Sequence, residues 1–135
     1  MDLTKRNGVE RESKDGLIVV TGAGGFIGGH LVKYFYEKGF KRLRAVDKKA
    51  FDQWYQYLPD VENICLDCSS EAACHRICEG ATEVYNLAAD MGGMGFIEAN
   101  RASCMLNVLI STHLLVAAHA CGVQRFFFAS SACVA

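Results

Sequence analysis

The sequence lacks any long run of charge of one sign and any long apolar run. Its 135 residues carry a formal net charge of −1, without a basic stripe, so neither nucleic acid nor an anionic membrane is indicated as a partner. No stretch approaches the ~18 consecutive apolar residues of a membrane span, and the N-terminus has no apolar signal-peptide core. We therefore expect a soluble, cytoplasmic protein with one hydrophobic core.

A convincing metal-binding pattern is also missing. Cys65, Cys68, Cys74 and Cys78, with His75 among them, raise zinc as an alternative, but the group has no second tight Cys-x-x-Cys pair. The four histidines show neither triad nor metal spacing. We predict no metal, and reduced, buried thiols in place of a disulfide framework.

What the sequence does have is a glycine-rich turn, TGAGGFIG at residues 21–28, directly after a β-branched stretch at 17–21. Gly22, Gly25 and Gly28 open a predicted helix at 26–38. Free N–H groups and the positive helix end attract a phosphate there, and the missing side chains let it approach. A glycine cluster alone also fits a plain turn, but the strand before it and the helix after it favour a phosphate cradle.

An acidic residue follows at the distance expected for a dinucleotide site. Asp47 ends the second predicted strand, at 43–46, about twenty residues beyond Gly28. We expect its carboxylate to bind the adenosine ribose of NAD and to repel the 2′-phosphate of NADP. Lys48 and Lys49 keep NADP open, because a cation after the acid can receive that phosphate. A solvated turn aspartate is the other interpretation.

Strand and helix patterns alternate along the rest of the chain. Because parallel strands need crossover connections, five such strands predict an α/β fold with a doubly wound parallel sheet of order 3-2-1-4-5. The polar residues 1–15 predict a disordered leader, which leaves 16–135 as one domain. The further predicted elements are strands at 61–66, 82–87 and 125–129 and helices at 51–58, 69–78 and 101–121.

Three stretches together resemble a known family. They are TGAGGFIG at 21–28, NLAADMGGMGFI at 86–97 and RFFFASSAC at 125–133, and they are similar to the extended short-chain dehydrogenase/reductases, above all to the GDP-mannose 3,5-epimerases. The first stretch is common to the whole extended branch, whereas the later two are more specific. The resemblance runs from about residue 17 to the end. It implies a Rossmann-like NAD-binding domain whose substrate lobe, in the family, lies further downstream.

The resemblance also implies roles for individual residues. The cofactor NAD would be held at its pyrophosphate by Gly22, Gly25, Phe26, Ile27 and Gly28, at its ribose by Asp47, near its adenine by Asp67, and along its length by Leu87, Ala88 and Ala89.

The implied substrate is GDP-mannose or a related sugar nucleotide. In the family, NAD oxidises C4 of the hexose, the ketone acidifies the C–H bonds at C3 and C5, and NADH finally reduces C4 again. Gly92 and Ser131 would contact the sugar, and Cys133 would be one of two acid/base groups, since a tuned thiol can exchange protons with such carbon acids. Without the neighbouring motifs, Cys133 is interpreted as a buried small hydrophobe.

The family's Tyr-x-x-x-Lys catalytic pair is missing from its place. Only Tyr34 and Lys38 have the spacing, and they lie in the first predicted helix. We therefore predict that these 135 residues alone do not epimerise GDP-mannose. Another extended enzyme, such as a 4-epimerase or 4,6-dehydratase, and a non-catalytic NAD-binding module remain alternatives. The resemblance implies a homodimer through the 101–121 helix, and cover by a further part of the same chain is the alternative.

Overall fold

The computed structural model describes residues 5–6, 9–10, 15–88 and 97–128, with side chains for 15–88 and 105–128. Its centre is a five-stranded sheet in which every neighbouring pair is parallel. The order β5-β4-β3-β6-β7 is the predicted order 3-2-1-4-5, which is thereby confirmed. The strands are β3 (Leu17–Thr21), β4 (Leu43–Asp47), β5 (Glu62–Cys65), β6 (Ala81–Asn86) and β7 (Arg125–Phe128).

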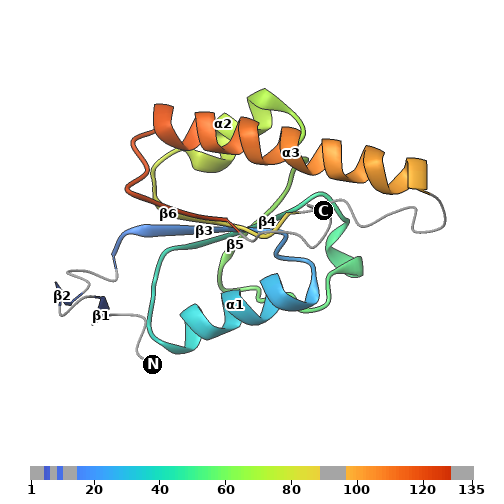
Figure 1. Ribbon diagram of the computed structural model, residues 1–135. Coiled ribbons are helices and arrows are strands. Elements are labelled where there is room, and N and C mark those ends of the chain that lie inside the picture. Colours follow the sequence, from blue (N-terminus) through green and yellow to red (C-terminus); the bar gives the residue numbers. More distant parts are fainter. Residues whose placement is uncertain (1–4, 7–8, 11–14, 89–96, 129–135) are drawn as a thin grey trace.

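Helices cover both faces of this sheet (Figure 1). Helix α1 (Phe26–Glu37) lies on one face, and α2 (Glu71–Cys78) and α3 (Ile97–Ala120) lie on the other. The central strand β3 is buried along its whole length because alternate side chains enter two separate cores. Leu17 and Val19 pack under α2 and α3, whereas Ile18 and Val20 pack under α1.

Two short strands lie outside this sheet, in the stretch predicted as a leader. Strands β1 (Lys5–Arg6) and β2 (Val9–Glu10) pair antiparallel with each other (Figure 1). The rest of residues 1–14 lies outside the described part of the chain. The disordered leader therefore stays a prediction.

The segment after β4 is not the helix predicted at 51–58. Only a single 3-10 turn, η1 (Phe51–Gln53), forms there. The N–H groups of Gln53 and Trp54 bond three residues back, and the N–H of Tyr55 then donates to Gly24 O at 2.9 Å. This tertiary bond takes the backbone away from a helical path. A smaller difference is that α3 begins at Ile97, earlier than the predicted 101, since no glycine or proline interrupts residues 97–100.

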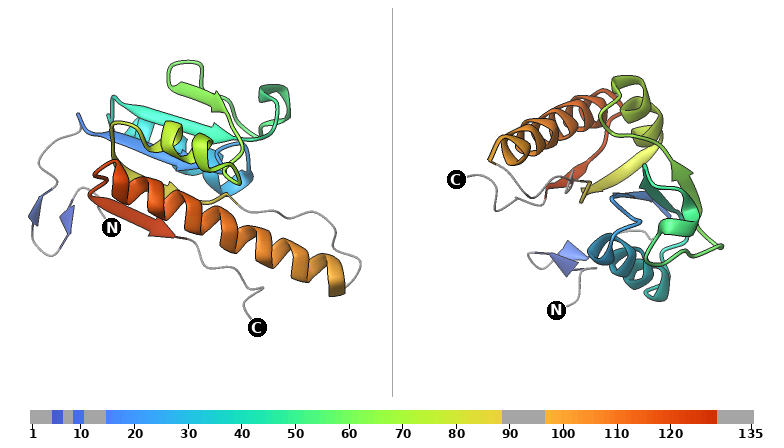
Figure 2. Two further views of the ribbon diagram at one scale, coloured as in Figure 1. Left: turned by 90° about the horizontal axis from the view of Figure 1, so that it is seen from above. Right: turned by 90° about the vertical axis from the view of Figure 1, so that its right-hand side faces the viewer.

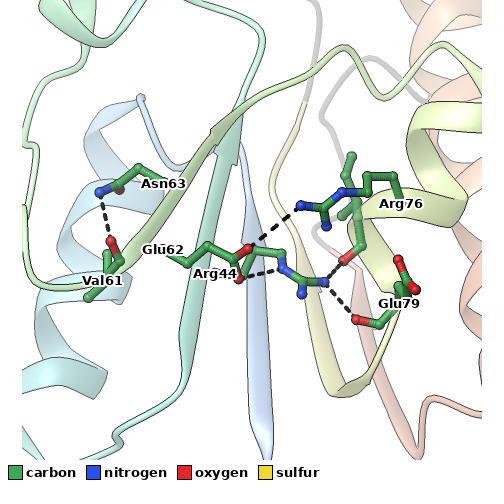
Figure 3. Close-up of polar contacts among 7 residues, drawn as sticks. Arg44, Val61, Glu62, Asn63, Arg76 and Glu79 are labelled. Carbon is green, nitrogen blue, oxygen red and sulfur yellow. Dashed lines mark hydrogen bonds and ion pairs between the residues drawn. The ribbon is translucent and has the colours of Figure 1, made fainter.

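A buried arginine links the sheet to the end of α2 (Figure 3). Arg44 of β4 is 8% exposed, and its Nε donates to Glu62 Oε1 on the neighbouring β5 at 2.8 Å. One terminal nitrogen donates to the carbonyl oxygens of Ile77 at 2.6 Å and Glu79 at 2.8 Å. The guanidinium thus satisfies carbonyls that the last turn of α2 leaves without helical partners.

Three of the clustered thiols are buried as predicted, and one is not. Cys68, Cys74 and Cys78 lie in the core beneath α2 and α3, whereas Cys65 is exposed. The buried prediction is wrong for Cys65 because it ends β5, which is an edge strand of the sheet. Within the described ranges, no group of three or more histidine, cysteine or acidic side chains could hold a metal ion.

Burial raises the pKa of Cys68 and Cys78 to about 12 and of Cys74 to about 11. Unfolded thiols ionise near their ordinary pKa of 9.0, so the stability from the protonated, buried form is present below that pH and is lost as the pH rises toward about 12. Each thiol contributes a slope of up to about 1.4 kcal/mol per pH unit. Urea unfolding under reducing conditions gives the free energy of unfolding at each pH between about 8 and 10. This free energy should fall less steeply with pH in Cys68→Ala than in the unsubstituted chain. An equal pH dependence of the free energy of unfolding in Cys68→Ala and in the unsubstituted chain would contradict this assignment.

In the part of the chain that is described, none of the helices combines the length and the apolarity needed to cross a bilayer.

Candidate functional site

The predicted cofactor-binding residues that the structure describes gather at one edge of the sheet, where its strands end. Thr21 is in register with Asn86, and Asp47 with Cys65, so the carboxyl ends of adjacent strands are level. Helix α1 begins at this edge, which faces the viewer on the right of Figure 2. In open α/β sheets, this edge is where ligands bind.

The glycine turn after β3 is shaped by close backbone packing. Gly22 has a φ of +72°, and a Cβ there would lie 2.5 Å from Leu87 O. A Cβ on Gly28 would overlap the Gly22 carbonyl oxygen and lie 3.0 Å from Ala23 Cα. These two glycines let the turn fit against the β6 loop and against the first turn of α1.

Gly25 is different, because the protein itself leaves room for a side chain there. The nearest atom to a Cβ on Gly25 is Gly22 O at 3.4 Å, an ordinary contact. Gly25 is the N-cap of α1, and that cap has no side-chain hydrogen bond and no acidic residue in the following turn. The first helical bond runs from Gly29 N to Gly25 O, so the N–H groups of residues 26–28 precede it. A dinucleotide pyrophosphate fits this uncapped, positive helix end.

Phe26 and Ile27 lie at the start of α1 with their side chains 59% and 70% exposed. Neither side chain is buried in the core. These two residues would therefore bind a phosphate through their main-chain N–H groups, which have no acceptor within the helix at its N-terminus.

Asp47 lies beside the glycine turn, as the sequence predicts. It is only 8% exposed; its Oδ2 accepts a hydrogen bond from Gly24 N at 2.9 Å and its Oδ1 accepts one from Lys49 N at 3.0 Å. Each oxygen keeps a further lone pair for a ribose hydroxyl. The carboxylate is therefore held in a fixed orientation, a feature that spacing alone does not reveal.

Asp67 is exposed and follows β5 at the same edge. Its Oδ1 accepts a hydrogen bond from Ser69 N at 2.9 Å, and this bond, together with the nearby Lys48 charge, lowers the pKa of the carboxyl. Asp67 is therefore a second carboxylate beyond Asp47, on the side where the adenine is predicted.

A small polar network missed by the sequence interpretation fixes the loop after β6. Thr21 Oγ1 donates to Asn86 Oδ1 at 2.9 Å, and Ala88 N donates to both of these oxygens at 3.3 Å. Asn86 Nδ2 also donates to Ser111 Oγ of α3 at 3.4 Å. The sequence pattern that indicates such a network is a polar residue at the last position of each of two buried strands, here Thr21 and Asn86. The network holds the half-buried Leu87 and Ala88 next to the glycine turn.

Four predicted site residues lie outside the described residues: Ala89, Gly92, Ser131 and Cys133. Their roles stay predictions.

Known proteins agree with this arrangement. The profile of the NAD dependent epimerase/dehydratase family matches residues 18–135. GDP-mannose 3,5-epimerase 1 of Oryza sativa subsp. japonica is 42% identical over 118 residues, which cover 87% of this chain and 31% of that protein. GDP-mannose 3,5-epimerase of Arabidopsis thaliana is 40% identical over the same shares. The predicted resemblance is confirmed, and the chain spans about a third of the length of these relatives.

Solved structures give the same fold. A short-chain dehydrogenase/reductase superfamily protein from Agrobacterium tumefaciens, with bound NAD, has a TM-score of 0.70 and 28% identity over 85% of this chain and 32% of that one. UDP-glucose 4-epimerase from Thermotoga maritima has a TM-score of 0.72 and 25% identity over 84% of this chain and 37% of that one. With its parallel sheet, glycine turn and matching profile, the chain belongs to the NAD dependent epimerase/dehydratase family.

Proposed function

We propose that the chain is the NAD-binding portion of a nucleotide-sugar epimerase that acts on GDP-mannose. The observation that carries the proposal is the room left at Gly25 over an uncapped helix end, with the Asp47 carboxylate fixed beside it. The similarity to the two plant epimerases supports the choice of substrate.

In this proposal each described residue has a defined task toward NAD. The N–H groups at the start of α1 bind the pyrophosphate, and the Asp47 oxygens accept hydrogen bonds from the ribose hydroxyls. Asp67 lies by the adenine, and Leu87 and Ala88 line the cofactor. NAD, when bound, accepts a hydride from C4 of the hexose.

The proposed substrate contacts complete the site. Gly92 lies against the sugar, Ser131 donates or accepts a hydrogen bond near the reacting carbon, and the Cys133 thiol returns a proton to a carbon next to the C4 ketone. A 4-epimerase or a 4,6-dehydratase of the same family is the second candidate, since UDP-glucose 4-epimerase shares the fold.

The 135 residues alone are proposed to bind NAD without epimerising GDP-mannose. The single Tyr-x-x-x-Lys match lies at the C-terminal end of α1, where Tyr34 belongs to the helix and Lys38 is its C-cap. The Lys38 amine lies 5.5 Å from the centre of the Tyr34 ring. Helix α1 begins at the ligand-binding edge and runs away from it. This pair is therefore at the wrong end of the helix to act on a sugar.

Calorimetric titration with NAD and NADP tests the proposal. We expect NAD to bind more tightly than NADP, and we expect Asp47→Ala to weaken NAD binding roughly 10- to 100-fold, because hydrogen bonds to a charged group are lost. Asp52→Ala, an exposed acid in the same segment, is the matched control and should bind like the unsubstituted chain. Absence of NAD binding would overturn the proposal.

Incubation of the same samples with NAD and GDP-mannose should give no epimerised product. Steady conversion by the pure chain would contradict the predicted inactivity. It would leave the NAD-binding assignment in place. A non-catalytic NAD-binding module is favoured if a protein of 14.8 kDa is found intact in the source cells.

The homodimer and the cytoplasmic location are also proposals. Along α3, five large apolar side chains are between 42% and 73% exposed: Met105, Val108, Leu109, Leu115 and Val116. A second copy of the helix would cover them, and a further part of a longer chain is the alternative. Sedimentation of the calorimetry samples distinguishes a homodimer from cover by a further part of a longer chain, because the mass of a single chain contradicts the homodimer.

A further inference from the structure

Gly24 is not one of the three motif glycines, yet it is held on three sides. Its N–H donates to Asp47 Oδ2 at 2.9 Å, and its carbonyl oxygen accepts from Tyr55 N at 2.9 Å. On the third side, a Cβ at this position would lie 2.8 Å from Cδ1 of the Trp54 ring and 2.9 Å from Asp47 Oδ2. Only a glycine fits between that ring and that carboxylate without a shift.

The groups that hold Gly24 are themselves connected. Trp54 is 8% exposed, and its Nε1 donates to Lys49 O at 2.9 Å. The N–H of Lys49 in turn donates to Asp47 Oδ1 at 3.0 Å. The segment from Asp47 to Tyr55 therefore closes on itself through the indole N–H and meets Gly24 at both of its ends. We name this arrangement the Gly24 clamp.

The clamp acts on the part of the turn that leads into α1. Gly24 precedes Gly25, the residue with room for a ligand at the helix N-terminus. With its N–H and C=O both bonded, Gly24 cannot rotate its flanking peptides without breaking the clamp. A turn that is already rigid loses less conformational entropy when it binds a ligand. Fixing Gly24 therefore favours binding at Gly25.

We propose that Trp54 is a positioning residue for dinucleotide binding and that it acts through the Gly24 clamp. This inference rests on the proposed function, because it assigns the clamp to the NAD pyrophosphate site. The indole N–H of Trp54 donates to Lys49 O and not to a motif glycine or to the first turn of α1. Trp54 therefore acts on the helix N-terminus indirectly. It is the single tryptophan of the chain, so any change in tryptophan fluorescence is assigned to Trp54.

The test uses Trp54→Phe, which keeps an aromatic ring and removes the indole N–H. Two quantities are measured, namely amide hydrogen exchange at Gly24 without ligand and the Kd for NAD by calorimetry. We expect faster exchange at Gly24 and a Kd increased roughly 3- to 10-fold, which corresponds to the loss of one hydrogen bond. In the unsubstituted chain, NAD should also change the tryptophan emission.

The matched control is Tyr36→Phe. It removes an exposed phenol hydrogen bond of 2.7 Å to Asp60, and Tyr36 lies at the opposite end of α1 from the turn. We expect it to leave both the Gly24 exchange rate and the Kd unchanged. Urea unfolding of each variant shows that the proteins compared are folded at the titration temperature.

Each outcome decides one part of the inference. Unchanged exchange at Gly24 in Trp54→Phe would overturn the clamp. Faster exchange with an unchanged Kd would overturn its role in binding and leave the proposed function standing. If the unsubstituted chain does not bind NAD, the proposed function and the positioning role both fail, and the exchange rates alone then decide whether the clamp exists.

Discussion

Replacing Gly28 by alanine is expected to lower the free energy of unfolding by about 3 kcal/mol, at the upper end of typical overpacking costs, and to abolish NAD binding. The added Cβ would overlap the Gly22 carbonyl oxygen and lie 2.8 Å from its carbon. Both are backbone atoms of a turn that also packs against Leu87, so they cannot move aside as a flexible side chain would. Either the turn opens or α1 shifts, and each would destroy the proposed pyrophosphate site.

Gly29→Ala is the control for this change, one position further along the same helix. A Cβ there meets Ala23 O and Gln56 Cβ at 3.5 Å, which are ordinary contacts. Alanine is the better helix former, so this variant should gain about 0.5–1 kcal/mol of stability. Urea unfolding and NAD titration measure both variants. Similar behaviour of the two would mean that the turn does not have the packing described.

Arg44→Met is the second change with a large expected effect. It removes the donor to the carbonyl oxygens of Ile77 and Glu79 and to Glu62 Oε1, while keeping an unbranched apolar stem. Leaving these acceptors without their donor should lower the free energy of unfolding by about 3 kcal/mol. Methionine cannot replace any of the three bonds. The measurement is urea unfolding of the purified variant.

Two control variants show whether the lost stability of Arg44→Met comes from its bonds to the carbonyl oxygens at the end of α2 or from its ion pair with Glu62. Arg42→Met removes an exposed arginine with one long bond of 3.4 Å to Asp15 O, and it should cost little. Glu62→Gln keeps an acceptor for Arg44, and its side chain is 42% exposed, so the cost should stay below about 1 kcal/mol. A cost for Glu62→Gln equal to that for Arg44→Met would contradict the assignment to the carbonyls.

The parts of the fold set by local patterns could be predicted from the sequence. The β-branched run ending at Thr21 and the glycines after it indicate strand, turn and helix by short-range physics. The parallel sheet follows from the lengths of the connections. The position of Asp47 at the end of its strand could also be predicted, because it depends only on spacing along the chain.

The contacts between distant segments could not be predicted. Arg44 looks like one of several arginines until α2 places its terminal carbonyls within reach. The helix expected at 51–58 fails because the Tyr55 N–H bonds to Gly24, which is far away in sequence. Exposure of Cys65 follows from the edge position of β5, which the local pattern of residues does not encode.

The proposed site for NAD is the carboxyl edge of the sheet, over the start of α1. Mapping of amide NMR shifts during a titration with NAD tests it residue by residue. We expect changes at residues 22–28, 47–49, 67 and 87–88, with no change at the turns of Gly39 and Gly80, which lie at the opposite ends of the strands. Shifts centred on those turns, or saturating NAD with no shift at residues 22–28, would contradict it.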